Sequence, residues 1–374
     1  MVEQLSQGEA FARIRLLRSP NIGPVSYRKL LARFGNAVAA LEALPELGGR
    51  GKRSYRPAPR DRIEREVEGI QRAGASYLFH DQPDFPALLG EIESAPPILT
   101  YRGDIKLAAK PCVAMVGARN SSAAAVKLAK QFGRDLAAQG YVVVSGLARG
   151  IDGASHEGAL SVSDGATIGV IASGIDIAYP PQHEALQEQI ASEGLLIAEQ
   201  PPGTQPRGSH FPSRNRIIAG LAAGTLVVEA APKSGSLITA RLAGEAGREV
   251  MAIPGSPLDT RSLGCNQLIR DGAVLVQSPD EVAELLESFE GTPRSRFNLA
   301  ETREEYDFSE LGDEAGLGGD TEEVIALLST APVAVDELVR QSGASMALVQ
   351  MALLELEITG ELERHSGGRV SLAG

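Results

Sequence analysis

Short turns that combine glycine, serine and a cationic side chain are the parts of this sequence best suited to binding chemistry. Three of them follow apolar runs, at Gly117–Ser122, Ser145–Asp152 and Ser173–Asp176, and their candidate residues are Gly117, Arg119, Ser145, Gly146, Arg149, Ser173 and Gly174. Small residues let backbone N–H groups approach an anion at a helix N-terminus, and an arginine adds charge-assisted hydrogen bonds. The repetition predicts a site for several phosphates, or for one polyanion that crosses all three turns.

The glycines have a second interpretation, because they also permit tight strand-to-helix turns that bind nothing. For Gly146 and Gly174 both interpretations stay open, whereas Arg119 favours ligand binding because an arginine contributes nothing to a tight turn. Neither GxGxxG nor GxxxxGK followed by Ser or Thr occurs in these turns; Gly169–Gly174 has the second spacing but lacks the lysine. We therefore expect no dinucleotide cofactor and no ATP hydrolysis, and we predict no cofactor at all.

A second cluster lies between Pro206 and Arg216 and combines basic side chains, an aromatic residue and amides ahead of a helix. This composition is typical of single-strand binding surfaces, where arginines follow phosphates and an aromatic ring stacks on a base. The candidate residues of this cluster are Arg207, Phe211, Arg214 and Asn215. A third segment, Lys233–Ala240, again places Gly and Ser ahead of a helix, and its candidate residue is Lys233. The alternative is that Phe211 anchors the core and that Arg214 or Arg216 forms a structural ion pair. The sequence does not decide between them.

Residues that could catalyse a reaction or ligate a metal are not arranged for it. His156, His183 and His210 lie near expected helix starts, but none has the spacing of a Ser/His/Asp triad or of a metal site. Cys112 and Cys265 belong to no CxxC pair, which excludes a disulfide scaffold and a cysteine zinc site and is typical of a reducing cytosol. We expect no catalytic residue and no metal.

The elements that would position the turns are short strands alternating with helices. The expected strands are Val113–Val116, Tyr141–Ser145, Ala166–Ile171, Leu195–Glu199, Thr225–Glu229, Glu249–Ile253 and Ala273–Val276, with helical patterns such as Ser122–Gln139 and Leu237–Glu245 between them. Continuous apolar runs without polar alternation indicate strands buried on both faces. The predicted fold class is α/β, with an extended Rossmann-like, doubly wound parallel sheet whose ligands bind beyond the carboxyl ends of the strands.

Patterns on either side of the sheet predict further domains. Before Leu47, apolar residues at helical spacing flank an Asn-Ile-Gly-Pro break, as in a helix-hairpin-helix unit, and the second helix is expected to pass through Leu30–Leu41. After an acidic stretch, three helical patterns and a two-stranded ribbon predict a winged helix. The expected domains are a helical SAM-like module at 1–60, a Rossmann-like domain at 61–288 with its sheet core at 111–279, an acidic linker at 289–320 and a winged helix at 321–374.

The net charge of −12 is unevenly distributed. Residues 1–110 hold 17 Lys and Arg against 13 Asp and Glu, whereas residues 280–374 hold 6 against 21. The acidity therefore belongs to the C-terminal quarter and does not exclude a nucleic-acid partner for the rest. The third helix expected in the winged helix, Ser345–Thr359, contains no Lys or Arg. Because binding to phosphates depends on cationic side chains, we expect that the winged helix does not read DNA.

Five segments of the chain resemble the DNA processing protein A family (DprA/Smf). They are Val113–Asn120 (VAMVGARN), Val144–Asp152 (VSGLARGID), Phe211–Ile218 (FPSRNRII), Lys233–Ala240 (KSGSLITA) and Pro254-Gly255. The resemblance spans the whole α/β domain, and the terminal modules resemble the family's three-part layout. It implies a non-enzymatic protein of natural transformation and competence that binds single-stranded DNA, protects incoming strands, dimerises and loads the recombinase RecA. It also places Gly117, Arg119, Ser145, Gly146, Arg149 and Phe211 on DNA-binding motifs of the family.

The competing hypothesis is a nucleotide-binding enzyme, because the α/β segment also resembles lysine-decarboxylase-like phosphoribohydrolases. Their activity requires a PGGxGTxxE motif, and the corresponding stretch from Lys233 has neither the double glycine nor the glutamate, so no acid/base group is evident. No apolar run is long enough for a transmembrane helix, and Met1–Phe11 has no apolar signal region. We expect a cytoplasmic homodimer that binds single-stranded DNA and RecA, and no membrane.

Overall fold

The structure, a computed structural model, describes residues 5–47, 56–287, 289, 328, 333–346, 348–349, 352–353, 362–365 and 369–372. The chain divides into two compact units, Met1–Tyr306 and Asp307–Gly374, and each is described by itself. Apart from Phe289, the acidic linker predicted at 289–320 lies outside the described residues.

Four helices precede the sheet in the first unit: α1 (Gln7–Leu17), α2 (Pro24–Phe34), α3 (Ala37–Leu47) and α4 (Arg60–Arg72). The single helix predicted through Leu30–Leu41 is wrong, because the chain turns between α2 and α3. Gly35 has a φ of +80°, a conformation that favours glycine, and Asn36 caps α3 by accepting a hydrogen bond from the Ala39 N–H at 2.8 Å. Helices α1 and α4 pack on the first two strands of the sheet through Ile14, Ile63, Phe79 and Ile98.

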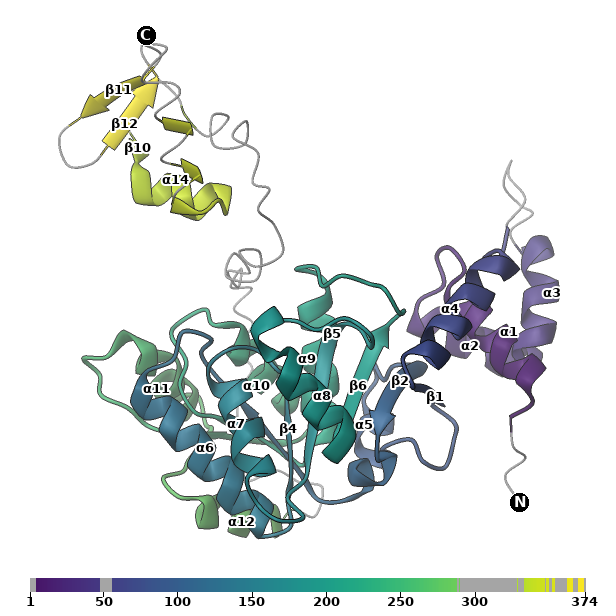
Figure 1. The fold of residues 1–374 in the computed structure, drawn as a ribbon, viewed down its shortest axis with the longest axis horizontal. Helices are drawn as coiled ribbons and strands as arrows, with labels where there is room; N and C mark the ends of the chain where they lie inside the picture. Colours follow the sequence, from purple (N-terminus) through teal and green to yellow (C-terminus); the bar gives the residue numbers. More distant parts are fainter. Residues whose placement is uncertain are drawn as a thin grey trace. The chain divides into compact units, whose positions relative to one another are not determined.

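A nine-stranded sheet forms the remainder of the first unit (Figure 1). Its strands are β1 (Ser76–Phe79), β2 (Ile98–Gly103), β3 (Cys112–Val116), β4 (Val142–Ser145), β5 (Thr167–Gly174), β6 (Leu195–Gln200), β7 (Gly224–Val227), β8 (Glu249–Ala252) and β9 (Val274–Leu275). The spatial order is β1-β2-β6-β5-β4-β3-β7-β8-β9, parallel from β6 to β9 and antiparallel at β1 and β2. All seven predicted strands are present, but the sheet core predicted at 111–279 is too short, because β1 and β2 precede it.

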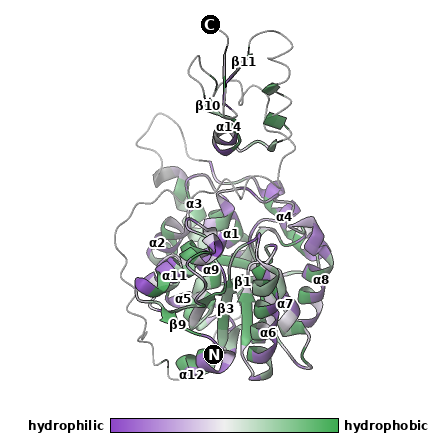
Figure 2. Ribbon diagram, turned by 90° about the vertical axis from the view of Figure 1, so that its left-hand side faces the viewer, coloured by the Kyte–Doolittle hydropathy of each residue, from purple (hydrophilic) through white to green (hydrophobic). Residues whose placement is uncertain are grey.

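Helices cover both faces of the sheet. One face carries α5 (Ala87–Glu91), α9 (His210–Leu221), α10 (Gly235–Glu245) and α11 (Leu263–Arg270), and the other carries α4, α6 (Ala123–Ala138), α7 (Ile151–Leu160), α8 (Glu184–Glu193) and α12 (Pro279–Glu287). Short 3-10 helices are η1 (Ile105–Ala109), η2 (Pro181–His183) and η3 (Thr260–Ser262). Along β3, Ala114 and Val116 enter the first core and Val113 and Met115 the second, as expected for a strand buried on both faces. Figure 2 shows the hydrophobic strands between helices of mixed character. The α/β prediction is confirmed.

The second unit contains the expected winged-helix elements. They are α14 (Val335–Ser342), β11 (Leu362–His365) and β12 (Arg369–Leu372). A further strand that was not predicted, β10 (Val333–Ala334), pairs with β12, which also pairs with β11. Leu338, Val349, Leu353 and Val370 form its core. The helix predicted at 321–328 lies outside the described residues except for Leu328, and the one predicted at 345–359 lies partly outside them. Of the helices that the structure describes, none is long and apolar enough to cross a membrane.

Candidate nucleic-acid interface

The carboxyl ends of the parallel strands bring the predicted turns to one edge of the sheet. We call the turns after β3, β4, β5, β6 and β7 the carboxyl-end edge. The central strand β3 lies between β4 and β7, so the strand order proceeds outward in both directions from this point. Open α/β sheets bind ligands at such a switch point. Arg119 follows β3, Arg149 follows β4 and Lys233 follows β7, so all three belong to this edge.

An aromatic ring connects the two arginines nearest to the switch point. The Cζ atom of Arg119 lies 5.1 Å from the ring centroid of Phe211, and that of Arg214 lies 5.8 Å from it. The ring of Tyr179 packs at 5.8 Å between centroids. A guanidinium within about 6 Å of an aromatic centroid is attracted by the ring quadrupole. Phe211 therefore holds Arg119 in place at the end of β3.

Phe211 itself is only 5% exposed. The aromatic ring that the sequence suggested as an exposed stacking surface lies in the interior, and the packing alternative describes it better. Its contribution to a nucleic-acid site is indirect, through the arginine that it supports.

Arg214 and Asn215 are also buried, at 6% and 9% exposure. The guanidinium of Arg214 donates to the carbonyl oxygens of Gly146 and Val170, and to Asn215 Oδ1 at 3.1 Å. Burial lowers the pKa of Arg214 to about 10. The predictions that Arg214 follows the phosphates of a strand and that Asn215 contacts DNA are therefore corrected, because Arg214 holds the turns together from inside and Asn215 accepts from it. The structural ion pair that the sequence left open is formed instead by Arg216 with Glu199.

A buried carboxylate that the sequence analysis overlooked occupies the turn after β4. Asp152 is 6% exposed, and its Oδ2 accepts hydrogen bonds from the N–H groups of Gly146 at 3.1 Å and Ala148 at 3.4 Å. Burial raises the pKa of Asp152, while the charges of Arg214 and Arg119 oppose that rise. These N–H groups, predicted to hold phosphate, are occupied by the chain's own carboxylate. The sequence did hold a signal for this contact, because an aspartate follows the turn glycine Gly146 by six positions.

Glu229 closes the turn after β3 in a similar way. Its carboxylate accepts hydrogen bonds from the Ser122 N–H at 2.9 Å and from the Ser122 hydroxyl at 2.6 Å. The same serine caps α6 by accepting from the Ala125 N–H at 3.1 Å. The start of α6 is therefore occupied by a side chain 107 positions away in sequence, a contact that no local pattern could reveal.

The other predicted residues divide into structural and exposed groups. Ser145 donates to the Met115 carbonyl at 2.6 Å, and Ser173 donates to the Ile177 carbonyl at 2.8 Å. A side chain at Gly117 would overlap Ile151, and one at Gly174 would overlap the Pro201 carbonyl. For these four residues the tight-turn interpretation is sufficient. The exposed members are Arg149, Arg207 and Lys233.

Lys233 has a φ of +67°, which is uncommon for a residue with a side chain. Such strained positions gather at functional sites. Together with its exposure at the end of β7, this conformation makes Lys233 a candidate contact for a phosphate.

Two of the histidines near helix starts, His156 and His183, have structural partners. His156 is fully buried with its Nδ1 2.7 Å from Thr167 Oγ1, and burial lowers its pKa to about 3. His183 Nδ1 lies 2.9 Å from the Leu147 carbonyl oxygen. Within the described residues, no group of three or more His, Cys, Asp or Glu side chains could hold a metal ion.

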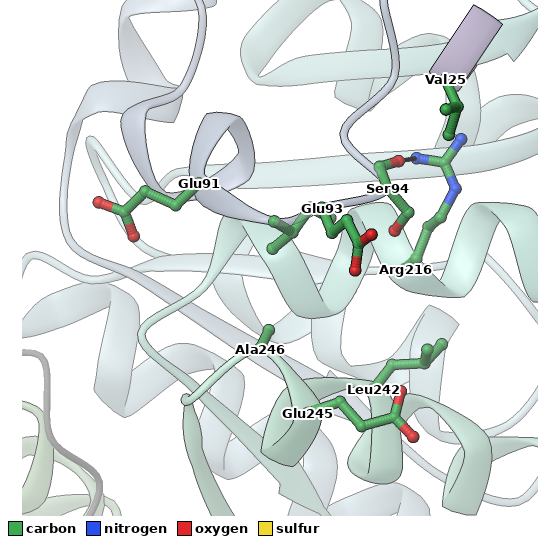
Figure 3. Close-up of a pocket in the computed structure, with 9 residues that line it drawn as sticks. Val25, Glu91, Glu93, Ser94, Arg216, Leu242, Glu245 and Ala246 are labelled. Atoms are coloured by element: carbon green, nitrogen blue, oxygen red, sulfur yellow. Dashed lines mark hydrogen bonds between the residues drawn. The ribbon is translucent and has the colours of Figure 1, made fainter.

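A pocket of about 450 Å³ lies between α2, α9, α10 and the segment around the end of α5 (Figure 3). Its charged lining residues are Glu91, Glu93, Glu245 and Arg216, and Val25 and Leu242 add apolar surface. The one arginine donates to the Ser94 carbonyl and pairs with Glu199. Three carboxylates against one paired cation make this a poor site for a phosphate.

Comparisons with known proteins find three family models that match parts of the chain. The family model for DNA recombination-mediator protein A matches residues 76–287, the DprA-like N-terminal HHH domain matches 7–69, and the DprA winged helix domain matches 312–368. Protein Smf of Synechocystis is 34% identical over 93% of this chain and 95% of its own length. The DNA processing protein DprA of Streptococcus pneumoniae is 48% identical over 57% of this chain and 77% of its own.

Two solved structures share the fold of the α/β domain. DNA processing protein A from Streptococcus pneumoniae has a TM-score of 0.57 at 42% identity and covers 61% of this chain and 78% of its own. The protein from Helicobacter pylori, whose structure was described for its single-stranded DNA binding mode, has a TM-score of 0.52 at 29% identity and covers 57% of this chain and 97% of its own.

Proposed function

The chain belongs to the DNA recombination-mediator protein A family, also called DprA/Smf, and we propose that it binds single-stranded DNA along its carboxyl-end edge. On this proposal it protects incoming strands and helps to load RecA during natural transformation and recombination. The observation that carries the proposal is the position of Arg119, held by Phe211 at the switch point of the sheet. The exposed cations on neighbouring turns, Arg149, Arg207 and Lys233, extend the site.

The chemistry of the edge supports single strands without sequence preference. At this edge the groups left to bind an anion are cationic side chains rather than backbone N–H groups. Asp152 and Glu229 already accept hydrogen bonds from turn N–H groups that could have bound a phosphate. Cationic side chains contact phosphates, which are the same in every nucleotide. The Helicobacter pylori relative, described by its single-stranded DNA binding mode, supports the same ligand class.

We further propose that the protein catalyses no reaction and acts as a cytoplasmic homodimer. The support for the first point is chemical: the stretch from Lys233 lacks the glutamate that a phosphoribohydrolase requires. The family assignment also does not favour that enzyme class. Release of free base from AMP-type nucleotides by the purified protein would contradict the proposal.

A binding comparison tests the main proposal. The protein should retain a single-stranded oligonucleotide on a filter at concentrations where the duplex of the same sequence passes. The logarithm of affinity should fall with the logarithm of salt concentration at a slope near −0.7 for each phosphate neutralised. A flat salt response would show that charge does not carry the binding.

A further inference from the structure

A buried anion lies among the cations of the candidate interface, and the proposed function does not use it. Asp152 stands at the start of α7 and is 6% exposed. The charges of both Arg214 and Arg119 act on its carboxyl group. The same two guanidiniums lie 5.8 Å and 5.1 Å from the ring of Phe211. Gly146 joins two of these charges, because its N–H donates to Asp152 Oδ2 at 3.1 Å and its carbonyl accepts from Arg214. Two cations and one anion therefore gather around the turn after β4, and their formal charges leave a single positive charge.

Asp152 also holds the turn after β4 in shape. Its Oδ2 binds the N–H groups on either side of Leu147, at Gly146 and Ala148. Leu147 has a φ of +58°, rarely adopted by leucine, and its side chain is fully buried. The carbonyl of Leu147 accepts a hydrogen bond from His183 at 2.9 Å. The turn is thus fixed by side chains from several elements, and a ligand would meet it already formed.

We propose that Asp152 is an internal counterion beneath the candidate interface: it fixes the Gly146–Ala148 turn, balances the charge of the buried Arg214 and limits the attraction of Arg119 for phosphate. This inference rests on the proposed function. A phosphate that approaches Arg119 meets a cation whose field is already reduced by a fixed carboxylate. Because water is excluded around buried groups, that reduction is larger than for two charges on an open surface.

Asp152→Asn in the full-length protein separates the two roles. The amide oxygen can still accept the two N–H bonds, but the negative charge is gone. Thermal stability should fall, because Arg214 then becomes a buried cation without its counterion. Affinity for a single-stranded oligonucleotide at moderate salt should instead rise several-fold. The salt slope should steepen by up to about 0.7, the increment for one further phosphate neutralised on a single strand. A merely structural aspartate would lower stability and affinity together.

Asp164→Asn is the matched control, because it removes the same charge from the opposite edge of the sheet. Asp164 is exposed, precedes β5 and has a φ of +61°, which asparagine tolerates well. The Asp164→Asn variant should bind DNA with the affinity of the wild type. Asp152→Ser is a second variant without the charge, with a hydroxyl that can accept a hydrogen bond.

Equal or weaker DNA binding by folded Asp152→Asn and Asp152→Ser would overturn the counterion role, and so would failure of both variants to fold. Arg119→Ala distinguishes this result from failure of the proposed function. If Arg119→Ala weakens binding but neither Asp152 variant strengthens it, only the present inference is wrong. If Arg119→Ala changes nothing, the proposed site is wrong as well.

Discussion

The guanidinium of Arg214 donates a hydrogen bond to the main-chain carbonyl of Gly146 and fills the space that a side chain at position 146 would need. The same group donates to the Val170 carbonyl at 2.8 Å. One buried side chain of α9 therefore joins β5 to the turn after β4, directly below the candidate interface. Position 146 must be glycine because of this internal contact, whatever binds outside.

Gly146→Ala is expected to lower the free energy of unfolding by about 1–3 kcal/mol, because the added methyl group must displace Arg214. Chemical denaturation measures the loss. Gly208→Ala is the control, since Gly208 is exposed and nothing lies within 4 Å of an added Cβ. Equal stability of the two variants would mean that Arg214 can move aside at no cost.

Arg119→Ala should weaken single-strand binding and leave the fold intact. Loss of a charge-assisted contact costs about 1.5–3 kcal/mol, which corresponds to roughly a ten- to hundredfold loss of affinity. Arg134→Ala is the control, because Arg134 is an exposed arginine of α6 that pairs with its neighbour Asp135 at 2.8 Å. Unchanged affinity of Arg119→Ala at moderate salt would remove the central support for the site.

Phe211→Ala should reduce both stability and affinity, with a stability loss of about 3–5 kcal/mol for a buried phenylalanine. Phe211→Leu keeps most of the apolar volume but removes the ring that supports Arg119. The melting temperature of Phe211→Leu should fall less than that of Phe211→Ala, while its affinity for DNA should fall nearly as far as that of Phe211→Ala. Wild-type melting of Phe211→Ala would contradict the buried position of the ring.

Acid should destabilise the protein through His156. Its pKa in the folded protein is about 3, below its ordinary value of 6.5, so the unfolded chain binds a proton more readily. The stabilisation is complete above pH 6.5 and is lost as the pH falls toward 3, by up to about 1.4 kcal/mol per pH unit. His156→Asn should show a shallower decline, and the difference between the two unfolding curves isolates this group. Parallel curves would contradict the assignment.

A chain that ends at Gly291 should bind single-stranded DNA as well as the full chain, or slightly better. Residues 321–374 hold only Arg340, Arg364 and Arg369 against eight acidic side chains, so this region repels phosphates. Filter binding of both forms checks the expectation. A folded, dimeric truncated protein that lost most of its affinity would show that the winged helix is a DNA site.

The fold was predictable where burial is continuous along the chain. All-apolar segments such as Val142–Val144 are buried on both faces of the sheet. A strand in this position requires apolar residues at every position, so a continuous apolar run predicts it. Strands β1 and β2 were harder to predict, because both mix polar with apolar residues, as in Ser76–Phe79, and β1 lies at the edge of the sheet. The break between α2 and α3 did have a local signal, the glycine and asparagine at 35 and 36.

The candidate site was predictable in its location but not in its connections. Strand ends and small residues indicate where a ligand can bind, and Arg119 and Lys233 lie there. The partners of the turn N–H groups are set by long-range contacts, such as that of Glu229 with Ser122, 107 positions apart. Long-range packing also decides the burial of Phe211 and Arg214. The composition of their segment suggested an exposed surface, but the fold buries both side chains.

The antiparallel pair β1–β2 also matters while the chain is being made. β2 joins the sheet by pairing with β6, and Thr100 Oγ1 donates to the Ala198 carbonyl 98 positions later. At synthesis rates of about 5–20 residues per second, roughly 5–20 s separate the appearance of these two partners. During that interval the growing chain on the ribosome holds the β1–β2 pair without the strand that joins β2 to the rest of the sheet.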